Sequence, residues 1–196
     1  MAQSPIGERA KLLSMNHIEK TFGGDVVALK DMNLTVNEGD FISLLGPSGC
    51  GKSTALRLIA GLMQPTRGRI DWAGEKGAGD LGVVFQEPTL MPWATVAENV
   101  WLPFRLRGTS YTEVKDEVLE ALRLVGLDGF QRAYPRELSG GMKMRVSIAR
   151  AMVTKPRLIL MDEPFAALDE ITRFKLNNDL LELKAAIGCT VIFVTH

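Results

Sequence analysis

A segment of nine residues has the composition and spacing of a phosphate-binding loop. It follows the apolar run Phe41–Leu45, matches G-x-x-x-x-G-K-[ST], and consists of Gly46, Pro47, Ser48, Gly49, Cys50, Gly51, Lys52, Ser53 and Thr54. Its glycines let backbone N–H groups converge on one centre, and the helix expected after it adds the positive end of a dipole. Lys52 is then expected to reach the β- and γ-phosphates of a nucleotide, and Ser53 to bind Mg²⁺. The alternative is a glycine-rich turn without a ligand, and Cys50 is interpreted as a small filler.

An acidic pair, Asp162 and Glu163, follows the uninterrupted apolar run Leu158–Met161. Such a run is typical of a strand that is buried on both faces of a parallel sheet, and ligands bind at the carboxyl ends of these strands. We therefore expect Asp162 to support Mg²⁺ and Glu163 to polarise the water that attacks a phosphate. The alternative is an acidic pair that is only solvated at a strand end.

Gln86 and His196 follow two further strand-like runs, Leu81–Phe85 and Val191–Val194. Because parallel strands end at one rim of their sheet, both side chains are expected near the acidic pair. The amide oxygen of Gln86 could coordinate a metal ion or water, and His196 could contact the γ-phosphate. Taken singly, a glutamine at a strand end is more often a surface residue, and a terminal histidine a frayed end.

Two weaker signals could also contact a nucleotide. Phe22 stands at the start of a Gly23–Gly24 turn, where its ring could stack on a base, although it could equally be a core residue. Ser139, Gly140 and Gly141 open a helical pattern, and a capped helix start presents free N–H groups and positive potential to an anion. Ser-Gly-Gly is also ordinary turn material.

The elements that position these groups begin with strands. Segment 11–36 is expected to form strands, because Met32, Leu34 and Val36 alternate with polar residues. The helix after the phosphate loop is expected to end near Gly61, and a short strand is expected over 68–74.

From residue 87 to residue 134 the pattern becomes helical. Thr95 with Glu98, and Ser110 with Glu113, have the spacing of a capping box. A further helix is expected after the Ser-Gly-Gly segment, and another over 169–188.

The composition excludes several classes of protein. The 196 residues are 46% hydrophobic and 23% charged, with no net charge, so nucleic acid is not expected as a partner. No apolar run approaches the ~20 residues of a membrane span, and the N-terminus lacks a signal-peptide core, so a cytosolic protein is expected. Cys50 and Cys189 have no metal-binding spacing and are assigned no redox role.

The order of these motifs resembles the nucleotide-binding subunit of ATP-binding cassette (ABC) transporters, from about Leu12 to His196. The matching parts are the phosphate loop, Gln86, the signature Leu138–Gly141, the run Leu158–Glu163, the turn Ala167–Asp169 and His196. The resemblance implies an α/β P-loop NTPase fold with a mainly parallel core sheet, an N-terminal antiparallel β-subdomain and an inserted α-helical subdomain.

Within this single domain over 1–196, the resemblance assigns 11–86 and 155–196 to the nucleotide-binding lobe and 87–154 to the helical subdomain. Family members usually continue with a further strand and helices, so the chain is expected to be truncated after the switch histidine, His196.

The resemblance also implies roles for individual residues. Phe22 would stack on the adenine of ATP, and the phosphate loop would hold its phosphates together with Mg²⁺. Gln86 would sense metal and water, and Asp162 would support the metal. Glu163 would act as the general base, and His196 would bridge the γ-phosphate to a second subunit.

Two copies in this family sandwich two nucleotides head to tail. Ser139, Gly140 and Gly141 would therefore contact ATP that is bound by the other copy, and Asp169 would lie at the interface between them. Met142 stands where the family most often has glutamine, but Ser139 and the backbone carry the phosphate contact, so activity is expected to survive.

The segment 87–104 resembles that of bacterial importers of the nitrate, sulfonate and taurine group. Its Trp93 could anchor a transmembrane permease subunit, although Trp93 and Trp101 could instead pack inside the helical insert. The resemblance implies a peripheral subunit at the cytoplasmic face of the inner membrane, with a substrate-binding protein as an indirect partner.

Two other functions stay open at this point. The chain could be a nucleotide-dependent switch that closes on ATP without efficient hydrolysis. It could also be a soluble family member that acts on ribosomes or DNA, although these typically carry two cassettes or basic surfaces.

Overall fold

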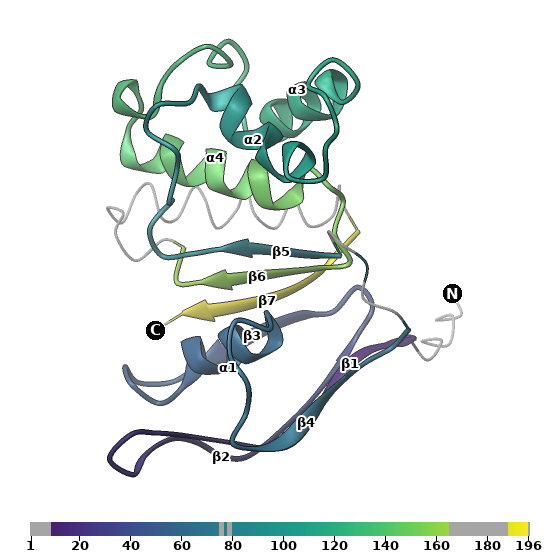
Figure 1. Cartoon of the computed structure of the whole chain (residues 1–196), viewed down its shortest axis with the longest axis vertical. Coiled ribbons are helices and arrows are strands. Elements are labelled where there is room, and N and C mark those ends of the chain that lie inside the picture. The colour runs from purple at the N-terminus through teal and green to yellow at the C-terminus, as the bar shows by residue number, and fades with distance from the viewer. Residues whose placement is uncertain (1–8, 75–76, 78–79, 165–187, 196) are drawn as a thin grey trace, which may run out of the picture.

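The computed structural model describes residues 9–74, 77, 80–164 and 188–195. His196, Asp169 and the helix expected over 169–188 therefore lie outside the described residues, apart from Gly188. Figure 1 shows a parallel sheet between a group of helices on one side and an antiparallel sheet on the other.

The parallel sheet has the strand order β3-β7-β6-β5 within the described residues. Its strands are β3 (Phe41–Leu45), β5 (Leu81–Val84), β6 (Leu158–Asp162) and β7 (Thr190–Thr195). All three pairings are parallel, so the carboxyl ends of these strands reach one rim, as the sequence predicted. The strand expected over 81–85 ends at Val84.

The antiparallel sheet has the order β2-β1-β4. It consists of β1 (Lys11–Phe22), β2 (Val26–Asn37) and β4 (Arg67–Trp72), which confirms the strands expected over 11–36 and the short strand expected over 68–74. Phe22 ends β1 and pairs with Val26 across the turn. The exposed turn therefore places the Phe22 ring at the end of the sheet.

The helices are α1 (Lys52–Ile59), α2 (Val96–Arg105), α3 (Lys115–Leu124) and α4 (Gly140–Met152), with a 3₁₀ turn at Pro135–Glu137. In Figure 1, α1 lies between the two sheets, whereas α2, α3 and α4 gather on the opposite side of the parallel sheet. None of the described helices is long and apolar enough to cross a bilayer.

The parallel sheet separates two apolar clusters. Leu158, Leu160 and Ile192 pack with α1 and β1 on one face of the sheet. Ile159 and Val191 pack with α2, α3 and α4 on the other face. Because neighbouring residues of one strand enter different clusters, burial on both faces explains why these runs are continuously apolar.

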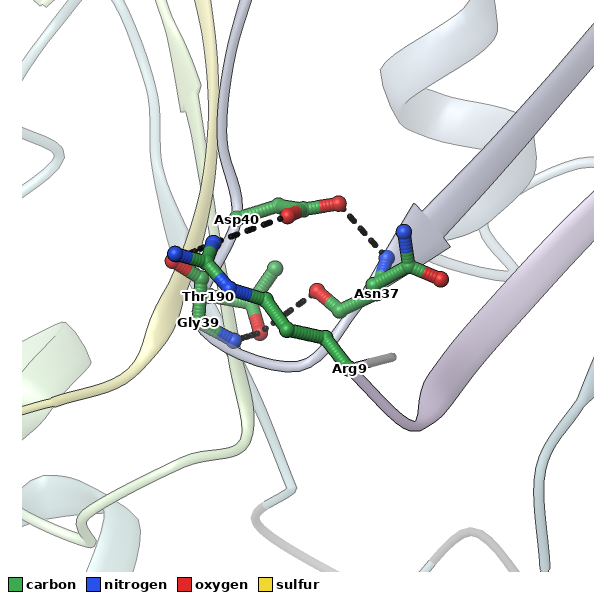
Figure 2. A network of polar contacts seen from close by, with 5 residues as sticks. All are labelled: Arg9, Asn37, Gly39, Asp40 and Thr190. Atoms are coloured by element: carbon green, nitrogen blue, oxygen red, sulfur yellow. Dashed lines mark hydrogen bonds and ion pairs between the residues drawn. The ribbon is translucent and has the colours of Figure 1, made fainter. Parts of the chain in front are cut away.

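A polar network fixes the connection between the two sheets (Figure 2). Asp40 accepts hydrogen bonds from the Asn37 backbone N–H at 2.8 Å and from Arg9 Nη1 at 3.2 Å. The Gly39 N–H donates to Thr190 Oγ1 at 3.0 Å, although the two residues are 151 positions apart. The turn after β2 is thereby attached to the start of β7, which sets where β3 enters the parallel sheet.

The second capping-box spacing does not start a helix. Ser110 donates to Glu113 Oε2 through both its backbone N–H and its hydroxyl, but α3 begins only at Lys115. Tyr111 instead packs edge-on against Trp101, with ring centroids 5.8 Å apart. Residues 111–114 form a turn before α3 begins.

Candidate functional site

The predicted phosphate loop connects the end of β3 to the start of α1. Gly51 is the N-cap of α1 and has φ +97°, a left-handed conformation that favours glycine. A Cβ atom at Gly51 would lie 2.3 Å from the Ala28 carbonyl oxygen and 2.7 Å from Leu29 Cδ2. The absence of a side chain thus lets the loop lie directly against β2.

The Lys52 ammonium group lies within the curl of this loop. Its Nζ donates to the Gly46 carbonyl at 2.6 Å and to the Pro47 carbonyl at 2.9 Å. Cys50 Sγ is 3.9 Å from the same nitrogen. An anion that enters the loop meets this positive charge, together with the N-terminal end of α1.

Ser53 and Asp162 are 109 positions apart in the sequence but are in contact in the fold. The Ser53 hydroxyl, in the first turn of α1, donates to Asp162 Oδ1 at 2.7 Å at the end of β6. A hydroxyl and a carboxylate side by side are hard oxygen ligands, which suit Mg²⁺ completed by phosphate oxygens and water. The described residues contain no group of three or more His, Cys, Asp or Glu side chains that could hold a metal ion alone.

An open pocket of about 310 Å³ extends from the phosphate loop to the end of the antiparallel sheet. Phe22, which is 43% exposed, lines it together with Val26 and Val27. The phosphate-loop side is formed by Ser48, Gly49, Gly51, Lys52, Ser53 and Thr54. The pocket therefore has an apolar wall at one end and a cationic, N–H-rich wall at the other.

Glu163 also lines this pocket, directly after Asp162. Its φ is +48°, which is uncommon for a residue other than glycine, and its N–H donates to the Val194 carbonyl at 3.1 Å. The chain thus turns sharply at the end of β6. Strained backbone of this kind is concentrated at functional sites, where surrounding contacts maintain it.

The other predicted site residues lie apart from this pocket or outside the described residues. Gln86 is exposed just beyond β5 and is not among the lining residues. Ser139 is the N-cap of α4 and accepts from the Met142 N–H at 3.2 Å, which confirms the predicted cap. Ser139 and Gly140 are exposed and do not line the pocket, nor does Gly141. His196 lies outside the described residues.

Sequence reasoning missed the apolar wall of the pocket. Val26 and Val27 are each 59% exposed, although both are β-branched apolar residues at the start of a strand. Exposed apolar side chains beside a polar pocket commonly mark a ligand surface. The available signal was the pair of adjacent valines that follows the turn Gly23-Gly24-Asp25.

The two tryptophans of the helical insert have different environments. Trp101 Nε1 donates to the Thr109 carbonyl at 3.1 Å, and its ring contacts Tyr111. Trp93, in contrast, is 77% exposed. Packing inside the insert is therefore correct for Trp101 and wrong for Trp93.

Comparisons with known proteins show the family of the chain. A family model described as ABC transporter matches residues 29–166. The nitrate import ATP-binding protein NrtD of Synechocystis sp. is 44% identical over 189 residues, which cover 95% of this chain and 71% of that protein. The aliphatic sulfonates import ATP-binding protein SsuB of Bacillus cereus is 45% identical over 190 residues, which cover 94% of this chain and 74% of that protein.

A solved structure is similar over most of both chains. The ATP-binding cassette MJ0796, in a dimeric post-hydrolysis state bound to ADP and Pi, matches with a TM-score of 0.79 and 36% sequence identity, covering 94% of this chain and 88% of that one. The predicted α/β fold of the ABC ATPases is thereby confirmed. The chain belongs to the ABC transporter family, as an ATP-binding ATPase subunit similar to those of the nitrate and sulfonate importers.

Proposed function

We propose that this chain binds and hydrolyses ATP to drive the import of a small solute through a bacterial membrane. The observation that carries the proposal is the 2.7 Å hydrogen bond from Ser53 to Asp162, which attaches the end of β6 to the pocket that Lys52, Ser53 and Glu163 line. A phosphate loop, a pair of metal-binding oxygens and an acidic side chain are the groups that nucleotide hydrolysis requires.

Nucleotide binding uses both ends of the pocket. The adenine ring stacks on Phe22 beside the exposed valines, and the triphosphate lies in the loop 46–54. The Phe22 ring also has a cationic neighbour, because Lys20 Nζ lies 5.3 Å from its centroid. Ser53 and Asp162 are the proposed Mg²⁺ ligands, with Gln86 as a third, and the bound ion would neutralise charge on the phosphates.

Hydrolysis depends on Glu163 as the proposed general base. A carboxylate at the end of β6 can accept a proton from water that attacks the γ-phosphate in line. Lys52 meets the charge that develops on the phosphoryl oxygens, and His196 is proposed to contact the same phosphate. Gln86 orients metal and water when its loop moves toward the pocket.

We further propose that two copies close on ATP as an isologous dimer. Ser139, Gly140 and Gly141 are exposed or half-buried at the start of α4 and do not line their own pocket, which supports a contact with the partner's nucleotide. The dimeric state of the related cassette supports the same arrangement. The boundaries 11–86 with 155–196, and 87–154, are proposed as its two lobes.

The proposed membrane contact is the segment 87–104. Trp93 is a large apolar side chain exposed beside the Gln86 loop, and such residues are frequent interface anchors. A permease subunit that binds there would hold this chain at the cytoplasmic face of the membrane, and a substrate-binding protein would act only through the permease. Similarity to the nitrate and sulfonate importers supports a small anion as the solute.

The test is steady-state ATP hydrolysis with Mg²⁺ over a range of protein concentrations, for the parent chain and Glu163→Gln. We expect activity that rises faster than linearly with concentration in the parent, and a loss of at least about a hundredfold in the variant. Glu163→Gln hydrolysing ATP as fast as the parent would refute the assigned base. ATP binding without hydrolysis in the parent would favour a nucleotide-dependent switch.

A further inference from the structure

The loop that follows Gln86 is attached to the last turn of α4 by one side chain. Arg150 Nη1 donates to the Thr89 carbonyl at 2.9 Å. Its Nη2 donates to the Pro88 carbonyl at 2.9 Å and to Thr89 Oγ1 at 3.1 Å. One guanidinium group therefore binds both residues of the loop across 61 and 62 positions of sequence.

The environment of Arg150 makes this attachment specific. Burial lowers the pKa of its guanidinium from the usual value, although the group stays protonated near neutral pH. Thr89 has φ +46°, so the loop is held in a conformation that residues other than glycine seldom adopt. Loss of Arg150 would remove the three hydrogen bonds that hold this turn in its left-handed conformation.

The next part of the same segment is attached to α2 by Asn99, which is fully buried. Its side chain accepts from the Met91 N–H at 2.8 Å. Its amide donates to the carbonyls of Met91, Ala94 and Thr95 at 3.2, 3.2 and 3.0 Å. Residues 88–95 are thus bound to the helices by two polar side chains.

Residues 85–87 differ from this bound segment. All three are exposed, and in the part of the chain that the structure describes their side chains make no hydrogen bond. They connect β5 to residues that are fixed on α4 and α2. Gln86 therefore lies in a short exposed segment, residues 85–87, that connects β5 to the residues bound to the helices.

The two ends of α4 have different surroundings. Its N-terminal end, capped by Ser139, is exposed, and its C-terminal end packs on β5. There a Cβ atom at Gly82 would lie 2.3 Å from the Ala151 carbonyl oxygen. A helix of this length spans about 20 Å, and a straight helix transmits a displacement of one end to the other.

We propose that Arg150 is a positioning residue that makes the placement of Gln86 depend on the position of α4. When the Ser139 end of α4 engages the nucleotide of a second copy, Arg150 carries Pro88 and Thr89 with the helix, and the short link moves Gln86 with respect to its own pocket. This inference rests on the proposed function, because it concerns hydrolysis at that site. In this arrangement α4 connects the partner's nucleotide, at its Ser139 end, to the pocket of its own copy through Arg150 and Gln86.

The kinetic test compares Arg150→Ala and Arg150→Lys with Arg145→Ala in the full chain. Arg145 is the matched control, because it is an arginine of the same helix whose Nη1 donates to the Val125 carbonyl at 2.8 Å. We expect Arg150→Ala to lower kcat about tenfold with KM for ATP changed less than about twofold, since misplacing a catalytic group reduces turnover. Arg150→Lys should recover part of kcat, and Arg145→Ala should keep the parental kcat.

A parental kcat in Arg150→Ala would overturn the proposal, as would an equal loss of kcat in Arg145→Ala. Amide hydrogen exchange with and without ATP provides a second readout that needs no hydrolysis. We expect ATP to slow exchange of residues 46–54 in every variant, but to slow exchange of 85–91 only where Arg150 is present.

The exchange measurement separates the two claims. ATP-dependent protection of 85–91 that persists in Arg150→Ala would refute the role of Arg150. Parental protein whose phosphate loop shows no protection by ATP would refute the proposed function instead.

Discussion

The contact between the phosphate loop and β2 predicts different effects for two alanine substitutions in one loop. Gly49 and Gly51 both have left-handed φ angles, +80° and +97°. A Cβ atom at Gly49 would meet no atom within 4 Å, whereas one at Gly51 would lie 2.3 Å from the Ala28 carbonyl oxygen. The pair therefore separates the cost of backbone conformation from the cost of the clash.

The magnitudes follow from these two costs. Alanine in a left-handed conformation costs about 1–2 kcal/mol, so Gly49→Ala should lower Tm by about 2–8 °C in a chain of this size. In Gly51→Ala the loop must also move away from β2, and overpacking adds about 1–3 kcal/mol. The total of about 2–5 kcal/mol corresponds to a Tm lower by about 4–20 °C.

Nucleotide affinity provides the second measurement. Because Gly51 precedes Lys52 and Ser53, displacing the loop from Ala28 moves both side chains with respect to Asp162. We expect calorimetric titration to give at least about tenfold weaker ATP binding for Gly51→Ala than for Gly49→Ala. Equal affinities and equal Tm values in the two variants would show that the contact with β2 does not hold the loop in place.

Three further predictions test other parts of the molecule. Lys52→Ala should weaken ATP binding at least about tenfold, because it removes the cation inside the loop, and unchanged affinity by titration would contradict this role. Phe22→Ala should weaken binding of ATP but not of inorganic triphosphate, and equal losses for both ligands would exclude stacking on the base. Hydrogen bonds from Thr95 hold the pKa of Glu98 below 4.5, so the capping box stabilises the fold above that pH and loses its effect as the pH falls through the lowered pKa. Glu98→Gln should therefore reduce Tm at pH 7, and the reduction should shrink as the pH falls below 4.5 through the lowered pKa; a reduction that is the same at every pH would refute the assignment.

Local patterns were sufficient to predict much of the fold. Alternation predicted β2, continuous apolar residues predicted β6, and the Thr95–Glu98 spacing predicted the start of α2. The cap at Ser139 was predicted in the same way. These features depend on neighbours within a few residues, so the sequence contains the information directly.

Contacts between distant residues could not be predicted in this way. The Ser110–Glu113 spacing is as good as that of Thr95 and Glu98, but residues 111–114 form a turn, in which Tyr111 packs against Trp101 of α2. The attachment of Arg150 to Thr89 has no local signal, because an arginine on a helix is usually a surface residue. The Ser53–Asp162 pair was predicted only as two separate metal ligands, and the structure supplies their hydrogen bond.

The place of β3 in the sheet has a consequence for how the protein is made. Within the described residues β3 pairs only with β7, and the turn before it binds Thr190 across 151 positions. A ribosome that adds about 5–20 residues per second therefore leaves the phosphate-loop strand without its partner for roughly 7–30 seconds. The strand that leads into the phosphate loop therefore joins the parallel sheet only after β7 has been synthesised.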